Sequence, residues 1–443
     1  MNANYKHGIV SKDDLVITDG NINVTSASTA MEGKDSVKIS GGTFNISAGT
    51  NGIKSTNTEA SDKGFISVTG GSFTVVANND AFEAETVLSI ESGSFDITTG
   101  GGSANASMKS DGTPNRNWQN NMGNGGGGPN GMGRPDDNGN GTGGEPPAMP
   151  TADNTDTTDS TSTSAKALKA GSEVNISGGE FKIDSADDSV HSNGNIVITG
   201  GNISAASGDN GMHANGNLTI SDGTVNITKS YEGIEGSIVT IDGGNVSVVA
   251  SDDGINCAGG SDTGSTDRMG ADQFSAQEGV ELNINGGTVT INAEGDGLDS
   301  NGNFTMTGGT VYVCGPTNGG NGALDYNGTA TVTGGTLIAC GAVGMEEGFG
   351  DNSTQYSVLH DLGSTVSANE KLTITDSDGK EILSFTPTKT WQSVVFTSAD
   401  LKKGETYTIT AGSQSETVTI DGIVTSNSKG KNFGGGHGGR RGF

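Results

Sequence analysis

Short runs of alternating apolar and polar residues recur along this chain at a nearly constant spacing. Between residues 173 and 259, an apolar-x-apolar triplet stands before each of four turn signals and another triplet follows it. The four signals lie 22, 22 and 21 residues apart: Gly178-Gly179, Gly200-Gly201, Asp222-Gly223 and Gly243-Gly244. Alternation with a period of two predicts strands with one buried face. The glycine pairs, and the Asn-Gly pairs that begin at Asn193, Asn215, Asn301 and Asn327, predict turns with positive φ.

A repeat of about 22 residues built from short strands is typical of a solenoid, because no strand in it can bury its apolar side alone. No window sustains apolar residues at i, i+3, i+4 and i+7, and glycine, at 76 of 443 residues, is too frequent for helix interiors. We therefore predict an all-β fold, a parallel β-helix with coils of about 22 residues.

The pattern changes at several points, which indicates how the chain is organised. One long segment rich in Asn, Gly, Pro, Thr and Ser cannot form a core, and we expect it to be a disordered insert within one coil. Near the C-terminus the spacing becomes that of antiparallel strands, which predicts a small β cap over the open end of the solenoid. The predicted parts are coils at 1–103, the insert at 104–165, coils at 166–360 with a smaller insert at about 258–278, the cap at 361–428, and a disordered Gly-rich tail at 429–443.

The net charge of −29 makes nucleic acid and anionic membranes poor partners and metal cations good ones. No run of about 18 apolar residues is present, so we expect no membrane span. No secretory leader precedes the first coil, which already begins at His7-Gly8-Ile9. We expect that the natural protein has a further N-terminal part, which carries any export signal.

Three cysteines are present, without the spacing of a metal site or a disulfide framework. Cys314 and Cys340 fall at the same place in successive repeats, and neighbouring parallel strands lie about 4.8 Å apart. A disulfide between them is therefore possible, but we favour two free thiols on neighbouring strands.

Polar residues line up when the coils are aligned on a recurring Gly-apolar pair. The position before the pair, with the residue preceding it, holds Asn51, Asp80, Asp187, Asp188, Asp209, Asn210, Glu232, Asp252, Asp253, Asp296 and Asn321. The position after the pair holds Glu32, Lys54, Glu83, Lys169, His191, His213, Glu235, Asn256, Asp299 and Asp325. Like charges stacked on neighbouring strands repel, so we expect a counter-ion along these two rows.

Calcium suits such rows, because it accepts six to eight oxygen ligands in flexible geometry. The alternative is that these Asp and Asn residues only stabilise turns, where both types are favoured. The motif is not the Gly-rich nonapeptide of calcium-loaded β-rolls. The candidate calcium ligands are Asp187, Asp188, Asp209, Asn210, Glu232, Glu235, Asp252, Asp253, Asp296, Asp299 and Asp325.

Four basic side chains share the second row. His191 and His213 could carry protons or bind a transition metal, or they could simply be exposed. Lys54 and Lys169 could abstract a proton from a uronate beside calcium, although we favour a role in neutralising the acidic row. Together with Tyr231, these four residues are the candidate carbohydrate contacts.

Several segments resemble the clostridial carbohydrate-binding β-helix family, over about residues 1–425 apart from the insert. The segments are KDDL at 12–15, GKDSVKISGG at 33–42, SYEGIEG at 230–236, ASDDGIN at 250–256, GDGLDSNG at 295–302 and WQSVVF at 391–396. The resemblance implies a secreted or surface-attached right-handed parallel β-helix, similar in fold to calcium-dependent pectate lyases. It also implies binding of plant cell-wall polysaccharide, acidic pectic chains and cellulose among them. The residues that it places in the family's acidic sites are Tyr231, Glu232, Glu235, Asp252, Asp253, Asp296 and Asp299.

The function that we predict is non-catalytic binding of a polysaccharide by a secreted or cell-surface monomer. Calcium shared between the protein and a uronate chain would overcome the repulsion between two acidic polymers. With two Trp and six Tyr, the chain has few platforms for a neutral glucan, so an acidic pectic glycan is favoured over cellulose. Two alternatives stay open: a pectate lyase-like enzyme with Lys54 or Lys169 as base, and a structural surface stalk or adhesin.

Overall fold

The computed structural model describes residues 1–106, 164–258 and 275–428. Most of the low-complexity insert, most of the smaller insert and the Gly-rich tail lie outside the described residues, so the disorder expected there stays a prediction. The described residues form 39 strands, one short 3-10 turn at Ser103–Asn105 and no α-helix. The all-β class predicted from the sequence is therefore confirmed.

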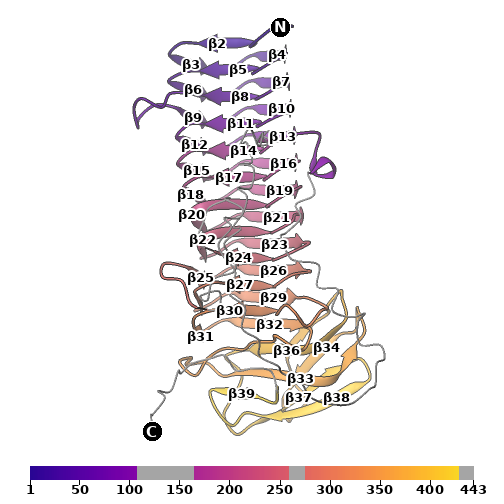
Figure 1. The fold of residues 1–443 in the computed structure, drawn as a ribbon. Helices are drawn as coiled ribbons and strands as arrows, with labels where there is room; N and C mark the ends of the chain where they lie inside the picture. The colour runs from indigo at the N-terminus through magenta and orange to yellow at the C-terminus, as the bar shows by residue number, and fades with distance from the viewer. Residues whose placement is uncertain (107–163, 259–274, 429–443) are drawn as a thin grey trace, which may run out of the picture. The chain divides into compact units, whose positions relative to one another are not determined.

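One strand of each repeat pairs in parallel with the matching strand of the next repeat, which builds the first sheet (Figure 1). Most of these strands have six residues, and their side chains alternate between buried and exposed. The strands are β1 (Asn2–Ala3), β4 (Asn21–Ser26), β7 (Thr43–Ala48), β10 (Ser72–Ala77), β13 (Ser94–Thr99), β16 (Glu180–Ser185), β19 (Asn202–Ser207), β21 (Thr224–Lys229), β23 (Asn245–Ala250), β26 (Thr288–Ala293), β29 (Thr310–Cys314) and β32 (Thr336–Gly341).

Each repeat also contributes a short strand and a following strand to a second parallel sheet. The short strands are β2 (Ile9–Ser11), β5 (Met31–Gly33), β8 (Ile53–Ser55), β11 (Phe82–Ala84), β14 (Leu168–Ala170), β17 (Val190–Ser192), β24 (Ile255–Cys257), β27 (Leu298–Ser300) and β30 (Leu324–Tyr326). The following strands are β3 (Asp14–Ile17), β6 (Ser36–Ile39), β9 (Phe65–Val68), β12 (Val87–Ile90), β15 (Glu173–Ile176), β18 (Asn195–Ile198), β25 (Glu281–Ile284), β28 (Asn303–Met306) and β31 (Ala330–Val332). In two repeats both strands merge, as β20 (Met212–Ile220) and β22 (Ile234–Ile241).

The stack of repeats is continuous across residues 107–163. The last three strands before this segment pair with the first three after it, β11 with β14, β12 with β15 and β13 with β16. The register of these pairs has no shift, since Phe82 faces Leu168 and Phe95 faces Phe181. The two halves of the stack therefore share one hydrogen-bonded framework.

Inward-facing side chains of both sheets form one apolar cluster. In the N-terminal half it includes a column of four aromatic rings, Phe44, Phe73, Phe95 and Phe181, which occupy the same register position in successive strands. Their ring centroids lie 4.6, 4.9 and 4.5 Å apart, and the rings are almost parallel. The repeat thus stacks identical side chains, and the chain fills its core despite a low aromatic content.

The glycine pairs have the positive φ predicted for them, but the Asn-Gly pairs do not. The second glycine of the pair has φ of 106° at Gly179 and 95° at Gly201. The glycines of the Asn-Gly pairs, such as Gly194, are absent from the positive-φ residues of the described chain, so that part of the prediction is wrong. Gly194 is required for a different reason, because a Cβ atom there would overlap the carbonyl oxygen of Ser172 in the preceding repeat.

Close packing between repeats predicts a strong effect for one glycine in the Gly-apolar pairs. In Gly233→Ala the new methyl group would overlap the carbonyl oxygen of Gly254 and a methyl group of Val248. We expect the free energy of unfolding to fall by about 1–3 kcal/mol, the usual cost of overpacking. Gly236→Ala in the same repeat is the control, since its nearest neighbour atom would be 3.3 Å away. Urea unfolding of both variants would contradict the expectation if their midpoints were equal.

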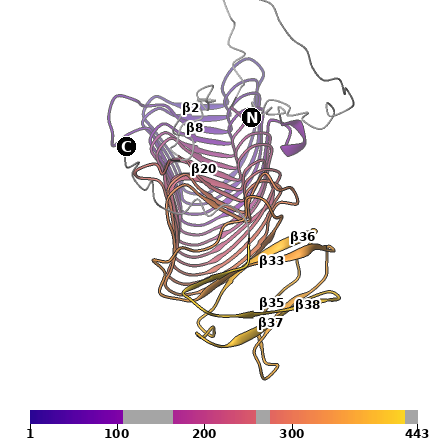
Figure 2. The same cartoon turned by 60° about the horizontal axis from the view of Figure 1, so that its bottom comes forward.

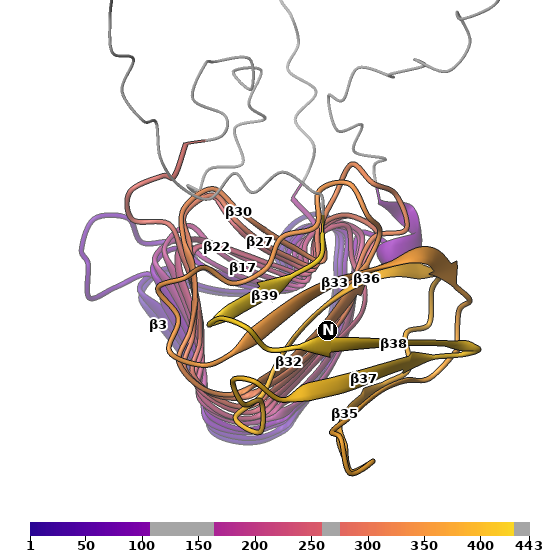
Figure 3. The same cartoon turned by 90° about the horizontal axis from the view of Figure 1, so that it is seen from below.

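At the C-terminal end, antiparallel strands extend the first sheet and form a third one (Figures 2 and 3). β36 (Trp391–Thr397) pairs antiparallel with β32 and with β33 (Ser357–Val366), and β33 pairs in parallel with β39 (Val424–Ser426). The third sheet has the order β35-β34-β37-β38. Its strands are β34 (Leu372–Thr375), β35 (Glu381–Phe385), β37 (Thr406–Ala411) and β38 (Gln414–Thr419).

The edge that β32 would expose is covered by β36. The start of this region differs from the prediction, because β33 begins at Ser357 rather than near residue 361. β33 and β36 both belong to the first sheet. A second apolar cluster, which includes Trp391, Phe396 and Tyr407, holds these strands together.

Cys314 and Cys340 are register partners on β29 and β32, and both are free thiols, as we favoured from the sequence. Among the described residues, no helix has the length and apolar character needed to cross a membrane.

Candidate functional site

One line of polar side chains follows the second sheet and takes one residue from each repeat after the first, where Val10 holds the equivalent position. Each member is the middle residue of a short strand, or its equivalent in β20 and β22, and is the register partner of the next. This order confirms the alignment made from the sequence. We call this line the strand row: Glu32, Lys54, Glu83, Lys169, His191, His213, Glu235, Asn256, Asp299 and Asp325.

A second line lies in the turns that precede these strands, where each residue's carbonyl accepts a hydrogen bond from the neighbouring repeat. The prediction from the sequence did not include one member, Lys166, although Lys166-Ala167-Leu168 holds the same place in its repeat as Asp188-Ser189-Val190 in the next. It also placed Asn321 in this line, but Gly322 takes that position, since Gly297 donates to the Gly322 carbonyl. We call this line the turn row: Asn51, Asp80, Lys166, Asp188, Asn210, Glu232, Asp253, Asp296 and Gly322.

Carboxylates of the turn row fix the turn of the following repeat. Asp188 accepts a hydrogen bond from the Asn210 backbone N–H at 3.0 Å, and Asp253 accepts one from the Asp296 N–H at 2.6 Å. Asp80 and Asp296 accept equivalent bonds from the backbone of the next repeat. Each of these bonds uses one carboxylate oxygen. Turn stabilisation, the alternative to calcium binding, therefore accounts for one oxygen of each carboxylate.

In the N-terminal half, lysines contact the acids of both rows. Lys54 Nζ lies 2.7 Å from Glu83, and Lys169 Nζ lies 3.3 Å from Asp80. Asn51 also donates to Glu83, at 2.6 Å. Both lysines thus contact acidic side chains, which is the geometry of the neutralising role favoured from the sequence.

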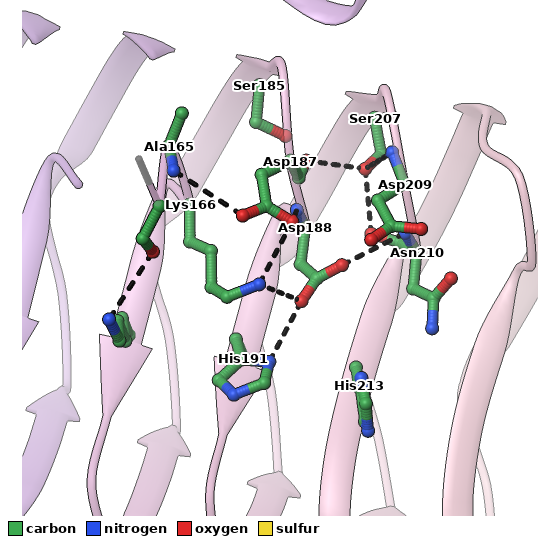
Figure 4. Close-up of polar contacts among 12 residues, drawn as sticks. Ala165, Lys166, Ser185, Asp187, Asp188, His191, Ser207, Asp209, Asn210 and His213 are labelled. Atoms are coloured by element: carbon green, nitrogen blue, oxygen red, sulfur yellow. Dashed lines mark hydrogen bonds and ion pairs between the residues drawn. The ribbon is translucent and has the colours of Figure 1, made fainter. Parts of the chain in front are cut away.

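In the middle of the rows, one buried ammonium group lies between two carboxylates (Figure 4). Lys166 Nζ is 2.9 Å from Asp187 Oδ1 and 2.6 Å from Asp188 Oδ2. Burial alone would lower the pKa of Lys166, but the charges of Asp188 and Asp187 and their hydrogen bonds outweigh it, so the pKa is raised. Burial raises the pKa of Asp188, but the Lys166 charge and the His191 hydrogen bond bring it below its usual value. The pair is therefore ionised on both sides at neutral pH.

Both histidines of the strand row are buried, at 3% and 1% exposure, so the alternative that they are merely exposed is wrong. His191 Nδ1 lies 2.8 Å from Asp188 Oδ2, and His191 Nε2 lies 2.9 Å from Asn193 Oδ1. His213 Nδ1 is 3.6 Å from Glu235, and the two imidazole rings meet edge to face at 5.0 Å. Possible ligand atoms of Asp188, His191 and His213 lie within 4.8 Å of one another, as do those of Asp187, Asp188 and Asp209.

The C-terminal half of the rows has a different charge balance. Among the described residues, no lysine or arginine forms an ion pair with Glu232, Asp296, Asp299 or Asp325, although these side chains are at least half-buried. Asn256 donates to Glu232 at 3.1 Å, and Asn210 donates to Glu235. We call this group the acidic half: Glu232, Glu235, Asp252, Asp253, Asp296, Asp299, Asp325 and Glu347.

Burial and mutual repulsion shift the titration of the acidic half upward. Burial, with the charge of Asp253, raises the pKa of Asp296 to about 8. Burial raises the pKa of Glu347 to about 8 as well, with the Asp325 charge adding to it. Burial and neighbouring acids also raise the pKa values of Glu232 and Asp299 well above their usual range. Keeping these groups ionised at neutral pH requires nearby positive charge.

Two further residues belong to this region. Tyr231 directly precedes Glu232 of the turn row. Its backbone N–H donates a hydrogen bond to the Asp209 carbonyl, and its own carbonyl accepts one from the Asp252 N–H. Glu347 was missed from the sequence, because it follows the last regular repeat. It accepts a hydrogen bond from the Tyr326 N–H at 3.3 Å and continues the acids beyond Asp325.

The donor set of the acidic half fits calcium better than a transition metal. Its described side chains offer carboxylate oxygens from several successive repeats, and hard oxygen donors suit calcium. At Asp187 and Asp188, by contrast, the Lys166 ammonium already lies between the carboxylates. The eleven candidate ligands from the sequence therefore fall into two groups: one lies around Asp188 and contacts Lys166, and the other belongs to the acidic half.

A comparison with protein-family models gives a match over most of the chain. The matching family is described as "Carbohydrate-binding domain-containing protein", and the matched residues are 1–211 and 212–322. No curated protein and no solved structure matches the chain. Since the family model covers well over half of the residues, this chain belongs to the carbohydrate-binding domain-containing protein family.

Proposed function

We propose that the protein binds an acidic cell-wall glycan of the pectic type through calcium held by the acidic half, without cleaving it. The proposal includes the right-handed parallel β-helix that the sequence resemblance implies, and a secreted or cell-surface monomer as the acting form. The family assignment supports a carbohydrate as the partner. The charge distribution along the two rows supports calcium and an acidic glycan.

One observation carries this proposal. In the first half of the two rows, lysines form ion pairs with acidic side chains. In the second half, no described lysine or arginine forms an ion pair with Glu232, Asp296, Asp299 or Asp325. Asp296 and Asp299 belong to the repeat of β27, and Glu232 precedes β22, two repeats earlier on the same side of the stack. Asp296 uses one carboxylate oxygen for the Gly322 N–H, and Asp299 and Asp325 are register partners in adjacent repeats, so a cation could be shared between repeats. Repulsion among these groups is the free-energy cost that cation binding would remove.

Recognition of a polyuronate follows from the same charges. With a net charge of −29, the protein alone repels a polyanion. Bound calcium would supply positive charge with open coordination positions, which carboxylates of the glycan can occupy. The protein's role is to hold carboxylates at the spacing of its repeats, about 4.8 Å, along the direction in which an extended chain would lie.

The lyase alternative is less well supported by the contacts. A proton-abstracting lysine must lie beside the cation and be unpaired, whereas Lys54 contacts Glu83 and Lys169 contacts Asp80. Both lysines also lie several repeats before Glu232 in the strand order. The stalk alternative uses the same calcium sites but requires no glycan, so a retention experiment separates it from the proposal.

The test is retention on insoluble polygalacturonate, in calcium and in chelator, with Asp299→Asn as the site variant. This change keeps the size of the side chain but removes one charge from the acidic half. We expect retention of the wild type only with calcium, and an affinity loss of at least about tenfold in the variant, the lower end of losses for changes around a metal site. Asp96→Asn is the matched control, because Asp96 is exposed on the outer face of the first sheet.

Equal retention in chelator and in calcium would show that binding does not use the cation. Wild-type protein that binds calcium but is not retained would favour the stalk. Release of unsaturated sugars, detected by ultraviolet absorbance, would favour the lyase.

A further inference from the structure

A cavity of about 390 Å³ lies between the outer face of the first sheet and the C-terminal sheet. Two of its residues come from β26 and β29 of the stack, and the others come from β35 and the segments next to the C-terminal sheet. Its volume falls within the range of small-molecule sites, about 300–1,000 Å³. The lining residues are Thr290, Tyr312, Lys371, Ser384, Phe385 and Thr386.

The lining combines an aromatic wall with hydroxyl groups. The rings of Tyr312 and Phe385 are stacked, with centroids 5.5 Å apart and planes 29° apart. Thr290, Ser384 and Thr386 add hydroxyls that can both donate and accept hydrogen bonds. A pyranose ring needs this pairing, because it presents an apolar C–H face and a rim of hydroxyl groups.

Contacts on one side of the cavity hold its wall in place without a ligand. Thr388 Oγ1 lies 3.6 Å from the Cys314 thiol at the end of β29. The Lys389 ammonium donates to the Ala293 carbonyl at the end of β26 and lies 3.4 Å from Glu294. The segment that follows β35 is thus tied to both strands that supply Thr290 and Tyr312. Binding would need little ordering of the chain, which favours affinity.

The cavity has little net charge of its own. Lys371 Nζ lies 3.1 Å from Glu381, so its charge is balanced on the same sheet. The protein as a whole is strongly acidic, and an anionic sugar would be repelled here unless a cation accompanied it. We propose that this cavity is a second carbohydrate site, which binds a pyranose residue of a neutral glycan without calcium.

The surface beside the cavity can support further sugar residues. Thr290 belongs to a line of outward-facing polar residues in the first sheet, each the register partner of the next. From Thr290 toward the N-terminus this line continues through Ser247, Asn226 and Ser204, all exposed or half-buried. The second site therefore lies on the first sheet, whereas the acidic half follows the second sheet.

The experiment is calorimetric titration of neutral β-linked hexasaccharides of glucose and of galactose into the full chain, in chelator. We expect binding to the wild type and a loss of at least about tenfold in Tyr312→Ala, as for an aromatic anchor that is truncated. Tyr312→Phe keeps the ring and should keep the affinity. Tyr5→Ala removes an exposed tyrosine near the N-terminus and is the control for the substitution itself.

Thr290→Arg fills the cavity from an exposed position without truncating a packed ring, so it tests the site even if Tyr312→Ala unfolds. Wild-type affinity in both Thr290→Arg and a folded Tyr312→Ala would overturn the proposal, as would no heat of binding with either sugar. Calcium-dependent retention on polygalacturonate should be unchanged in Thr290→Arg, which separates a failure here from a failure of the calcium-dependent site.

Discussion

Replacing Lys166 with methionine is expected to lower the free energy of unfolding by about 3–5 kcal/mol, the cost of removing one partner from a buried ion pair. Methionine keeps most of the apolar stem and removes only the ammonium. Asp187 and Asp188 would then face each other without the charge that lies 2.9 and 2.6 Å from them. Chemical unfolding in chelator measures the effect.

The matched control is Lys182→Met. Lys182 is also paired with an aspartate, but the distance is 3.7 Å and the two side chains are 81% and 59% exposed. Such a surface pair contributes about 0–1 kcal/mol. Equal losses in the two variants would mean that Lys166 does not carry the balance of charge. Added calcium should restore part of the stability of Lys166→Met, because a divalent cation can take the place of the ammonium between two carboxylates.

Without divalent cations, the free energy of unfolding is expected to fall as pH rises from about 5 to about 9. Asp296 and Glu347 each have a folded pKa of about 8, above the usual values of 3.8 and 4.5. The folded state therefore holds more protons than the unfolded state in this window, and stability is lost as pH rises through the folded pKa. Each unit of pKa shift corresponds to about 1.4 kcal/mol, so the acidic half in sum changes stability by several kcal/mol.

Calcium should abolish most of this loss, since it favours the ionised carboxylates. Thermal unfolding at pH 5, 7 and 9, with calcium or with chelator, gives the comparison. Calcium should add little at pH 5 and most at pH 9. The opposite sign applies to Asp188, whose pKa is lowered: its contribution is present above about pH 4 and is lost below it. A calcium effect that is equal at pH 5 and pH 9 would contradict the expectation.

The repeat pattern was sufficient to predict the strand row, because side chains in parallel strands follow the register of the backbone. One apolar residue per short strand, such as Leu168 facing Val190, fixed the alignment of the polar residue beside it. The turn row was predicted less well, since turns vary in sequence while keeping the same backbone position. Lys166 was not predicted, although Lys166-Ala167-Leu168 matches Asp188-Ser189-Val190 of the next repeat.

The charge balance of the rows was predicted only in part, because the sequence placed Lys54 and Lys169 among the acids but did not indicate the contacts of Lys166. Lys166 and Asp188 are 22 residues apart, and only the fold brings them within 2.6 Å of each other. The burial of His191 and His213 depends on the turns of neighbouring repeats, which the alternation pattern does not describe. The cavity at Tyr312 is formed with the third sheet, whose packing against the stack has no repeat to indicate it.

The pairing of β13 with β16 has a practical consequence for engineering. Hydrogen bonds join β13 to β16, β11 to β14 and β12 to β15. The strands before residues 107–163 therefore pair directly with the strands after them. The chain can therefore leave the stack and return at this corner without a shift in register. A reporter protein whose termini lie close together could be grafted here, and would label the molecule away from both the acidic half and the cavity at Tyr312.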